Sequence, residues 1–256
     1  AAAASASDAD TPEEPWFPEQ ASQLLRTPGF IPPLAAFVTS IAVTNVVGAF
    51  MAQKLYSAGI QDQGTIDLSG AGFEVAIVIG GIVLGGVVDS NKEYKSVTIA
   101  CLAATLVAVL LLGLGGLPKV LVICALIAIG TFAGPVQPIN AELAVEVTYP
   151  ADENAIEAVQ QLCGNLASAL LVPLCEAAAS WRVALPALPG SPSGSGNELH
   201  GDTILLLLII TSVGVYFSTF SAPLRRTLVD EENCLADQLE NVALPAPAAG
   251  TDKGTP

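Results

Sequence analysis

The side chains of this sequence that are best suited to bind a solute or an ion are carboxylates and amides inside apolar segments. Glu142 and Glu146 lie one helical turn apart in the stretch NAELAVEVTYP, which closes an apolar run that begins near residue 120. Ionisable and polar groups at membrane depth are costly, so they are candidates for binding a solute or an ion. The candidate substrate-binding residues come from several apolar segments: Asn45, Glu74, Gln137, Gln161 and Asn165. Such groups suit a small organic solute, including an organic cation.

Each of these side chains also has a structural interpretation. Amides in a membrane can hydrogen-bond between helices, and a glutamate near a helix end can extend its carboxylate to water. Glu74 is interpreted either as a coupling carboxylate that binds a proton or an organic cation, or as an interfacial side chain, since it lies less than two turns from Asp67. Both interpretations stay open at this point.

The sequence indicates no catalytic site, metal site or cofactor. No nucleophile–base set, glycine-rich phosphate loop or cluster of metal ligands can be found in it. The single histidine, His200, lies near a Gly/Ser/Pro-rich stretch, and four of the five cysteines lie in apolar segments. The net charge of −15 argues against nucleic acid as a partner. We therefore do not expect an enzyme.

The composition indicates a membrane protein. Hydrophobic residues make up 52% of the chain and charged residues only 13%, about half the charged share of a soluble domain. A helix needs about 20 mostly apolar residues to cross about 30 Å of hydrocarbon. Six segments meet this requirement: 30–56, 68–88, 96–116, 119–143, 156–180 and 203–223. We predict an all-α membrane protein with six transmembrane helices in contact with the lipid bilayer, and a fourth helix loosened around Pro135 and Pro138.

The basic residues predict which ends of the helices face the cytoplasm. Five of the nine Lys and Arg residues fall on one side of the six segments, three on the other and one in the far tail. The positive-inside rule then places both termini in the cytoplasm. Residues 1–28 and 227–256 are expected to be disordered cytoplasmic segments because they are acidic and polar. They flank a transmembrane domain over residues 29–226. The plasma membrane is the expected location, with an organelle membrane as the alternative.

Two stretches resemble known transporters. GGIVLGGVVDSNKEYK is similar to the short cytoplasmic signature of the major facilitator superfamily, in which small residues pack a helix end, Asp89 closes it and basic residues follow. QPINAELAVEVTYPADEN resembles the tenth helix and following loop of the feline leukaemia virus subgroup C receptor-related transporters. The residues on that pattern are Pro138, Glu142, Val145, Glu146, Thr148, Tyr149, Pro150 and Glu153. The resemblance runs from about residue 26 to residue 226.

The resemblance implies that the six helices are helices seven to twelve of a twelve-helix fold, with a three-plus-three inverted repeat. A six-helix N-terminal half, absent from this chain, would be its partner, and residues 1–28 would link the two halves. The absence of a starting Met is expected of such a fragment. The implied function is secondary active transport of a small organic solute by alternating access, as in relatives that carry choline, ethanolamine or haem. The alternative is a non-transporting membrane receptor or assembly subunit.

The resemblance also implies roles for single residues. Asp89, Lys95, Glu142 and Glu146 would form a conformational latch at the cytoplasmic helix ends. An amide of the eleventh helix falls at Asn165, or at Gln161 with a four-residue gap. Val43 stands where the resemblance implies an aromatic residue on the seventh helix, so no cation–π contact is expected from that position.

Overall fold

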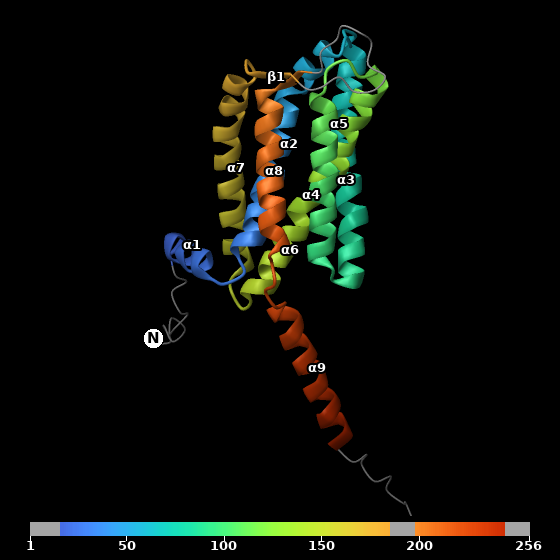
Figure 1. Ribbon diagram of the computed structural model, residues 1–256. Helices are drawn as coiled ribbons and strands as arrows, with labels where there is room; N and C mark the ends of the chain where they lie inside the picture. Colours follow the sequence, from blue (N-terminus) through green and yellow to red (C-terminus); the bar gives the residue numbers. More distant parts are fainter. Residues whose placement is uncertain (1–15, 185–197, 244–256) are drawn as a thin grey trace, which may run out of the picture.

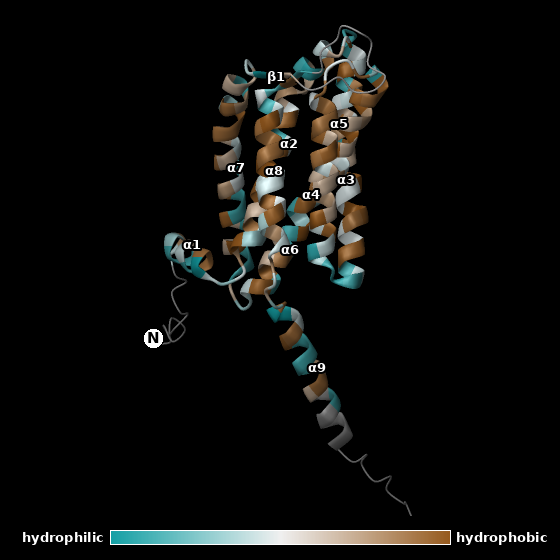
Figure 2. Cartoon of the chain, viewed as in Figure 1, coloured by the Kyte–Doolittle hydropathy of each residue, from teal (hydrophilic) through white to brown (hydrophobic). Residues whose placement is uncertain are grey.

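The predicted six transmembrane helices are present in the computed structural model, which describes residues 16–184 and 198–243 (Figure 1). Six helices are long and apolar enough to cross a membrane. They are α2 (Ile31–Ser57), α3 (Gln63–Asn91), α4 (Tyr94–Gly113), the pair α5 (Lys119–Ala133) and α6 (Val136–Thr148), α7 (Glu153–Ala178) and α8 (Gly201–Ser218). Hydrophilic residues gather at the two ends of the bundle and along the helices outside it (Figure 2). The all-α membrane fold predicted from composition is therefore confirmed.

Aspartates begin two of these helices. Asp62 caps α3 by accepting hydrogen bonds from the hydroxyl of Thr65 at 2.7 Å and from its backbone N–H at 2.8 Å. These two bonds lower the pKa of the Asp62 carboxyl below its ordinary value. Asp152 caps α7 by accepting from the backbone N–H groups of Asn154 and Ala155. Both carboxylates satisfy N–H groups that have no partner within their own helix.

The fourth membrane-spanning segment is kinked where the sequence predicts loosening, at two residues whose backbone angles stay helical. Gly134 and Pro135 separate α5 from α6, because proline lacks the N–H that would continue the helical ladder. The hydroxyl of Ser40 on α2 donates to the carbonyl oxygen of Ala133 at 2.6 Å, which satisfies a group at the break. Pro138 does not interrupt α6, since it lies in the first turn, where a missing N–H costs nothing. The break is thus local to Pro135.

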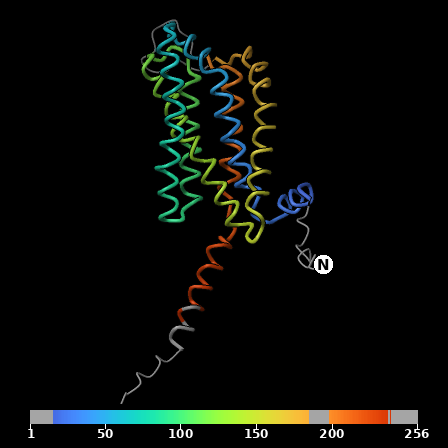
Figure 3. Tube along the Cα trace, turned by 180° about the vertical axis from the view of Figure 1, so that it is seen from behind, coloured from blue at the N-terminus to red at the C-terminus, as the bar shows by residue number. Residues whose placement is uncertain are grey.

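Helices from the two halves of the sequence pack against each other. α2 packs mainly on α7, α6 and α8, whereas α3 packs on α5, and α4 contacts both α5 and α8. The tube in Figure 3 shows the same arrangement from behind, with α6 crossing toward α2 below α5. The contact between α3 and α5 is close, because a Cβ atom added at Gly80 would collide with the carbonyl oxygen of Thr131.

Two helices lie outside the transmembrane bundle, in segments where the sequence predicts disorder. α1 (Phe17–Arg26) lies beside α7, and α9 (Arg225–Ala243) extends away from the bundle. These residues are helical in the structure, the expected disorder of the terminal segments stays a prediction, and residues 1–15 and 244–256 lie outside the described part. At the opposite end, β1 (Arg182–Ala184) pairs antiparallel with β2 (Glu198–His200). We call the end with α1 and α9 the tail end, and the end with β1 and β2 the hairpin end.

The glycines of α3 provide a test of the α3–α5 contact. Gly80→Ala should lower the free energy of unfolding by about 1–3 kcal/mol, because the added methyl group forces two backbones apart. Gly81→Ala is the matched control, since nothing lies within 4 Å of a Cβ atom at that position. It should leave stability unchanged or raise it, because alanine is the better helix former. Thermal unfolding in lipid nanodiscs measures both, and equal effects would contradict the close contact.

Candidate solute cavity and charged helix ends

A cavity of about 430 Å³ lies between α2, α6 and α7 toward the tail end. Its wall combines one aromatic ring with amides and carboxylates. These are Phe37, Gln137, Gln160, Gln161, Glu142, Glu153 and Glu157. The described residues that line the cavity include no Lys, Arg or His. The electrostatic character of the wall therefore favours a positively charged occupant.

Gln160 carries an unused hydrogen-bond acceptor in this wall. Its Nε2 donates to the carbonyl oxygen of Asn140 at 3.1 Å, but its buried Oε1 receives no hydrogen bond from the described residues. The side chain of Asn140 also has an unpaired acceptor. Its Nδ2 donates to Thr98 Oγ1 at 3.1 Å, but its Oδ1 receives no hydrogen bond from these residues. Buried unpaired oxygens are costly. Both oxygens are buried, so the described structure does not expose them to an occupant of the cavity.

The structure brings together two of the five predicted substrate residues. Gln137 and Gln161 both line the cavity, from α6 and α7. Asn165 lies one turn beyond Gln161 and is exposed outside the lining. Asn45 donates from Nδ2 to Ser168 Oγ at 2.9 Å, which joins α2 to α7 and fits the structural interpretation. Glu74 is exposed on α3, away from the cavity, so its proposed coupling role stays a prediction.

Glu146 binds the start of α9. Its Oε2 accepts hydrogen bonds from the backbone N–H of Thr227 at 3.1 Å and from the Thr227 hydroxyl at 3.0 Å. Thr227 lies in the first turn of α9, where free N–H groups and the helix dipole favour a carboxylate. The sequence suggests that Glu146 reaches water or an absent partner. Instead it is buried, and its partner lies 81 residues away in the same chain.

The link between α8 and α9 is held by two more helices. Lys95 on α4 donates from Nζ to the carbonyl oxygen of Phe220 at 2.7 Å. Arg226 forms a salt bridge of 3.1 Å with Glu153 on α7. Together with Glu146, these contacts join the tail ends of α4, α6 and α7 to one short segment. The sequence could not indicate these partners, because they lie far apart along the chain.

Asp89 and Glu142 both line a second cavity of about 390 Å³, which lies between α3, α4 and α6. The phenol of Tyr94 also lines it, and the buried Tyr94 hydroxyl has no hydrogen-bond partner in the described part of the chain. Glu142 lines both cavities. The four residues assigned to a latch thus gather at the tail end, and the latch itself stays a prediction.

An ion pair that sequence reasoning missed closes the hairpin end. Lys54 Nζ lies 2.6 Å from Asp202 Oδ2, with side chains only 20% and 8% exposed. Lys54 is in the last turn of α2 and Asp202 in the first turn of α8, so each charge also complements a helix dipole. The sequence shows opposite charges at the ends of the first and last spans, which is compatible with an ion pair. Whether they pair depends on the packing of α2 against α8, which the sequence does not show.

Comparison with known proteins supports a transporter. No family model matches the chain. The chain is 25% identical over 218 residues to solute carrier family 49 member A3 of Xenopus tropicalis, a match that covers 81% of this chain and 44% of that protein. The chain thus spans less than half the length of this relative. Similarity to a solute carrier, together with six long apolar helices, supports a multi-pass membrane protein of the transporter class.

The Lys54–Asp202 pair should stabilise the bundle. Asp202→Asn keeps the shape of the side chain and an oxygen for the Thr203 N–H, but leaves the Lys54 ammonium largely buried without its counter-charge. We expect the free energy of unfolding to fall by about 2 kcal/mol, less than for a fully buried pair. The double variant Lys54→Met with Asp202→Asn should recover most of that loss. Thermal unfolding in nanodiscs is the measurement.

The exposed pair of Arg182 and Glu198 at the same end is the matched control. Glu198→Gln should change stability by less than about 1 kcal/mol, because solvent screens an exposed pair. A loss in Glu198→Gln as large as that in Asp202→Asn would refute the special role of the buried pair.

Glu146 should hold the first turn of α9. Glu146→Ala removes an acceptor of two hydrogen bonds, and bonds to charged groups contribute about 1.5–3 kcal/mol. We expect the amides of residues 225–230 to exchange with deuterium roughly 10- to 100-fold faster. Glu146→Gln, which keeps one neutral acceptor, should give a smaller increase. Glu142→Ala is the control, and unchanged exchange in Glu146→Ala would argue against the contact.

Proposed function

We propose that this chain is the C-terminal six-helix half of a major facilitator transporter, which moves a small organic solute across the plasma membrane by alternating access. The observation that carries the proposal is the cavity between α2, α6 and α7, with amides and carboxylates in its wall and no basic side chain among the described lining residues. A six-helix N-terminal half would complete the site. The match to only 44% of a solute carrier is consistent with such a missing half.

The packing of the helices supports this architecture. In an inverted repeat, corresponding helices of two three-helix units interleave around the substrate site. α2 packs against α7 and α3 packs against α5, so each of these pairs joins the first three spans to the last three. The break at Pro135 also supports a transporter, because interrupted helices commonly border transporter substrate sites. α6, which follows the break, supplies Gln137 and Glu142 to the cavity.

The preferred solute is an organic cation that carries N–H or O–H donors. Carboxylates attract its charge, and charge-assisted hydrogen bonds to them are about twice as strong as neutral ones. Phe37 supplies an aromatic group in the same wall, where the sequence offers Val43 instead at the position that the family resemblance implies. Phe37 could then contribute the cation–π contact that Val43 cannot.

Uptake of labelled ethanolamine and choline by cells that express the full-length protein tests this proposal. Gln161→Ala and Glu157→Ala should each lower kcat/KM for ethanolamine by about 10-fold or more, because each removes a contact to a charged solute. Leu162→Ala is the matched control, since Leu162 is an exposed neighbour of Gln161 outside the cavity lining.

Two outcomes would count against the proposal, and a third would invalidate the comparison of variants. Saturable uptake that Gln161→Ala and Glu157→Ala leave unchanged would exclude this cavity as the solute site. Equal losses in Leu162→Ala would indicate general damage to the fold. Absence of any cation uptake, with the protein present at the cell surface, would exclude these two organic cations as solutes and favour a non-transporting membrane receptor or assembly subunit.

A further inference from the structure

We propose that α1 is an interfacial helix, whose exposed apolar face enters the head-group region of the lipid bilayer at the tail end. The inference is independent of the proposed solute, because it concerns how the bundle is seated in the membrane. It rests on the sequence pattern of α1, on what its apolar face contacts and on where the helix lies.

The sequence of α1 divides cleanly into two faces. At 100° per residue, Phe17, Pro18, Ala21, Leu24 and Leu25 fall within one arc of the helix. The opposite arc carries the polar side chains Glu19, Gln20, Ser22, Gln23 and Arg26. Helices with a continuous apolar face and low overall hydrophobicity commonly lie in the plane of a membrane interface.

Only part of the apolar face is covered by the bundle. Leu24 is buried in a cluster with Ala155, Ile156 and Val159 of α7. The remaining apolar side chains at this end are open, with Trp16 75% exposed, Phe17 37% exposed and Leu25 46% exposed. The exposed aromatic side chains at the start of α1 and the exposed leucine near its end leave much of the apolar face uncovered by the bundle.

The position of α1 indicates that the partner is lipid. The helix lies across the direction of the membrane spans, beside the tail end of α7, in both Figure 1 and Figure 3. There the charged first turns of α7, with Glu153 and Glu157, give way to exposed leucines such as Leu162 and Leu166. This is the level of the head groups for a membrane-spanning helix, where tryptophan and other amphipathic rings concentrate.

The charges of α1 indicate how it would bind. Glu19 and Arg26 balance each other on the polar face, and no polybasic cluster is present in α1. Binding would therefore depend on apolar area and not on anionic lipid. This distinguishes α1 from a helix that is recruited by negative membrane charge.

The turn after α1 would transmit its position to the bundle. Gly29 has a φ of +94°, and a Cβ atom at that residue would approach the Cβ of Ala222 to 2.6 Å. Phe30, the next residue, is fully buried. The connection to α2 is thus seated against the α8–α9 link, and α1 is packed on α7. Contact of α1 with lipid would set the depth of α2 and α7, two of the three helices that border the solute cavity.

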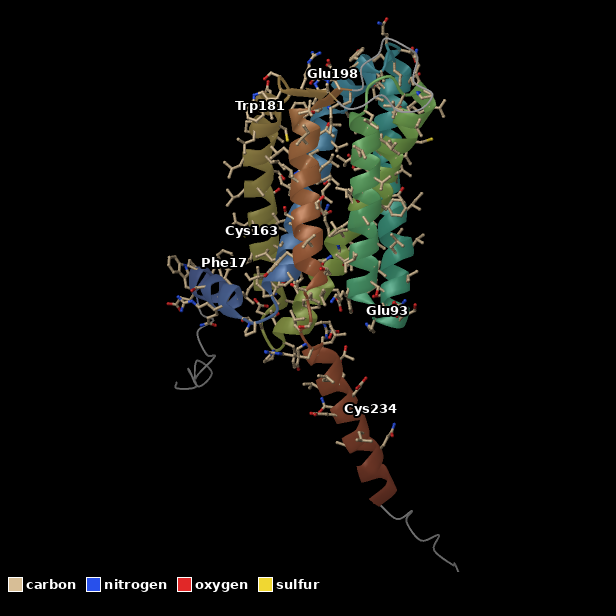
Figure 4. All side chains as sticks on the ribbon, in the orientation of Figure 1. Phe17, Glu93, Cys163, Trp181, Glu198 and Cys234 are labelled. Carbon is tan, nitrogen blue, oxygen red and sulfur yellow. The ribbon has the colours of Figure 1, made fainter. Side chains whose placement is uncertain are left out.

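Tryptophan fluorescence can locate α1 relative to the bilayer. The sequence has two tryptophans, Trp16 beside α1 and Trp181 at the hairpin end, 72% exposed. Figure 4 shows Phe17, next to Trp16, and Trp181 at opposite ends of the bundle. Trp181→Phe leaves Trp16 as the single reporter in the chain. The protein would be placed in phosphatidylcholine nanodiscs that carry bromine at shallow or deep acyl positions.

The proposal predicts blue-shifted Trp16 emission that shallow bromine quenches at least twofold more than deep bromine, with or without anionic lipid. Blue-shifted emission without bromine quenching would mean that protein covers this face, and would overturn the proposal. Water-like emission quenched by iodide would overturn it as well. Quenching that requires anionic lipid would exclude the apolar mode of binding.

Two glutamate substitutions give a matched pair within α1. Phe17→Glu places a carboxylate on the apolar face, and should reduce bromine quenching of Trp16 by at least half. Gln23→Glu places the same group on the exposed polar face and should leave quenching unchanged. Phe17→Glu adds an acidic residue to the first turn, which favours the helix, so loss of helix would not explain its effect. Equal quenching in the two variants would contradict the orientation proposed for α1.

Discussion

The need to satisfy every polar group inside hydrocarbon determines most of this structure. Lipid offers no hydrogen bonds, so the membrane-spanning backbone must be helical. The hydroxyls inside the spans follow the same rule, since Thr44, Ser69, Thr131 and Thr148 each donate to a carbonyl three or four residues earlier. These four hydroxyls donate their hydrogens to the backbone, so they are not available as donors to a ligand. Among the remaining polar groups, a carboxylate and an amide of α6 have partners on other helices, and the buried hydroxyls of Tyr94 and Thr105 have no partner among the described residues.

The interruption at Pro135 explains why α6 has this role. A straight helix from Lys119 to Thr148 would run as one rod, but the kink at Pro135 allows α6 to pack on α2 while α5 packs on α3. Ser40 binds the carbonyl of Ala133 at the break, which removes much of the cost of an interruption at membrane depth. The same rearrangement places Asn140 against Gln160 of α7. The cavity between α2, α6 and α7 thus depends on one proline and on the hydroxyl that compensates for it.

The sequence predicts features that depend on local composition and misses those that depend on distant partners. Span number and the break could be predicted because the hydrocarbon acts on each segment separately. Gln137 and Gln161 could be recognised as candidates for the same reason. The hydrogen bond from the Asn45 side chain to Ser168 could not be predicted in this way. α1 was missed because an isolated ten-residue helix is marginal in water, and it is stabilised here by Leu24 against α7. α9 has an acidic composition that resembles disorder, and the contact of its first turn with Glu146 is not visible along the chain.

The proposed solute site and the first turn of α9 share the carboxylate of Glu153, so binding at the site and the contact of α9 are coupled energetically. Glu153 lines the solute cavity and also forms the salt bridge to Arg226. A bound cation would compete with Arg226 for this carboxylate, and by reciprocity an intact Arg226 contact would weaken binding of the cation at Glu153. Because the Arg226 and Glu153 side chains are 37% and 63% exposed, solvent screens the pair and the coupling from it alone is small, of the order of 1 kcal/mol or less. Glu146 and Lys95 hold the same link without lining the cavity. Loss of the Arg226 contact would therefore loosen the α8–α9 link without releasing it.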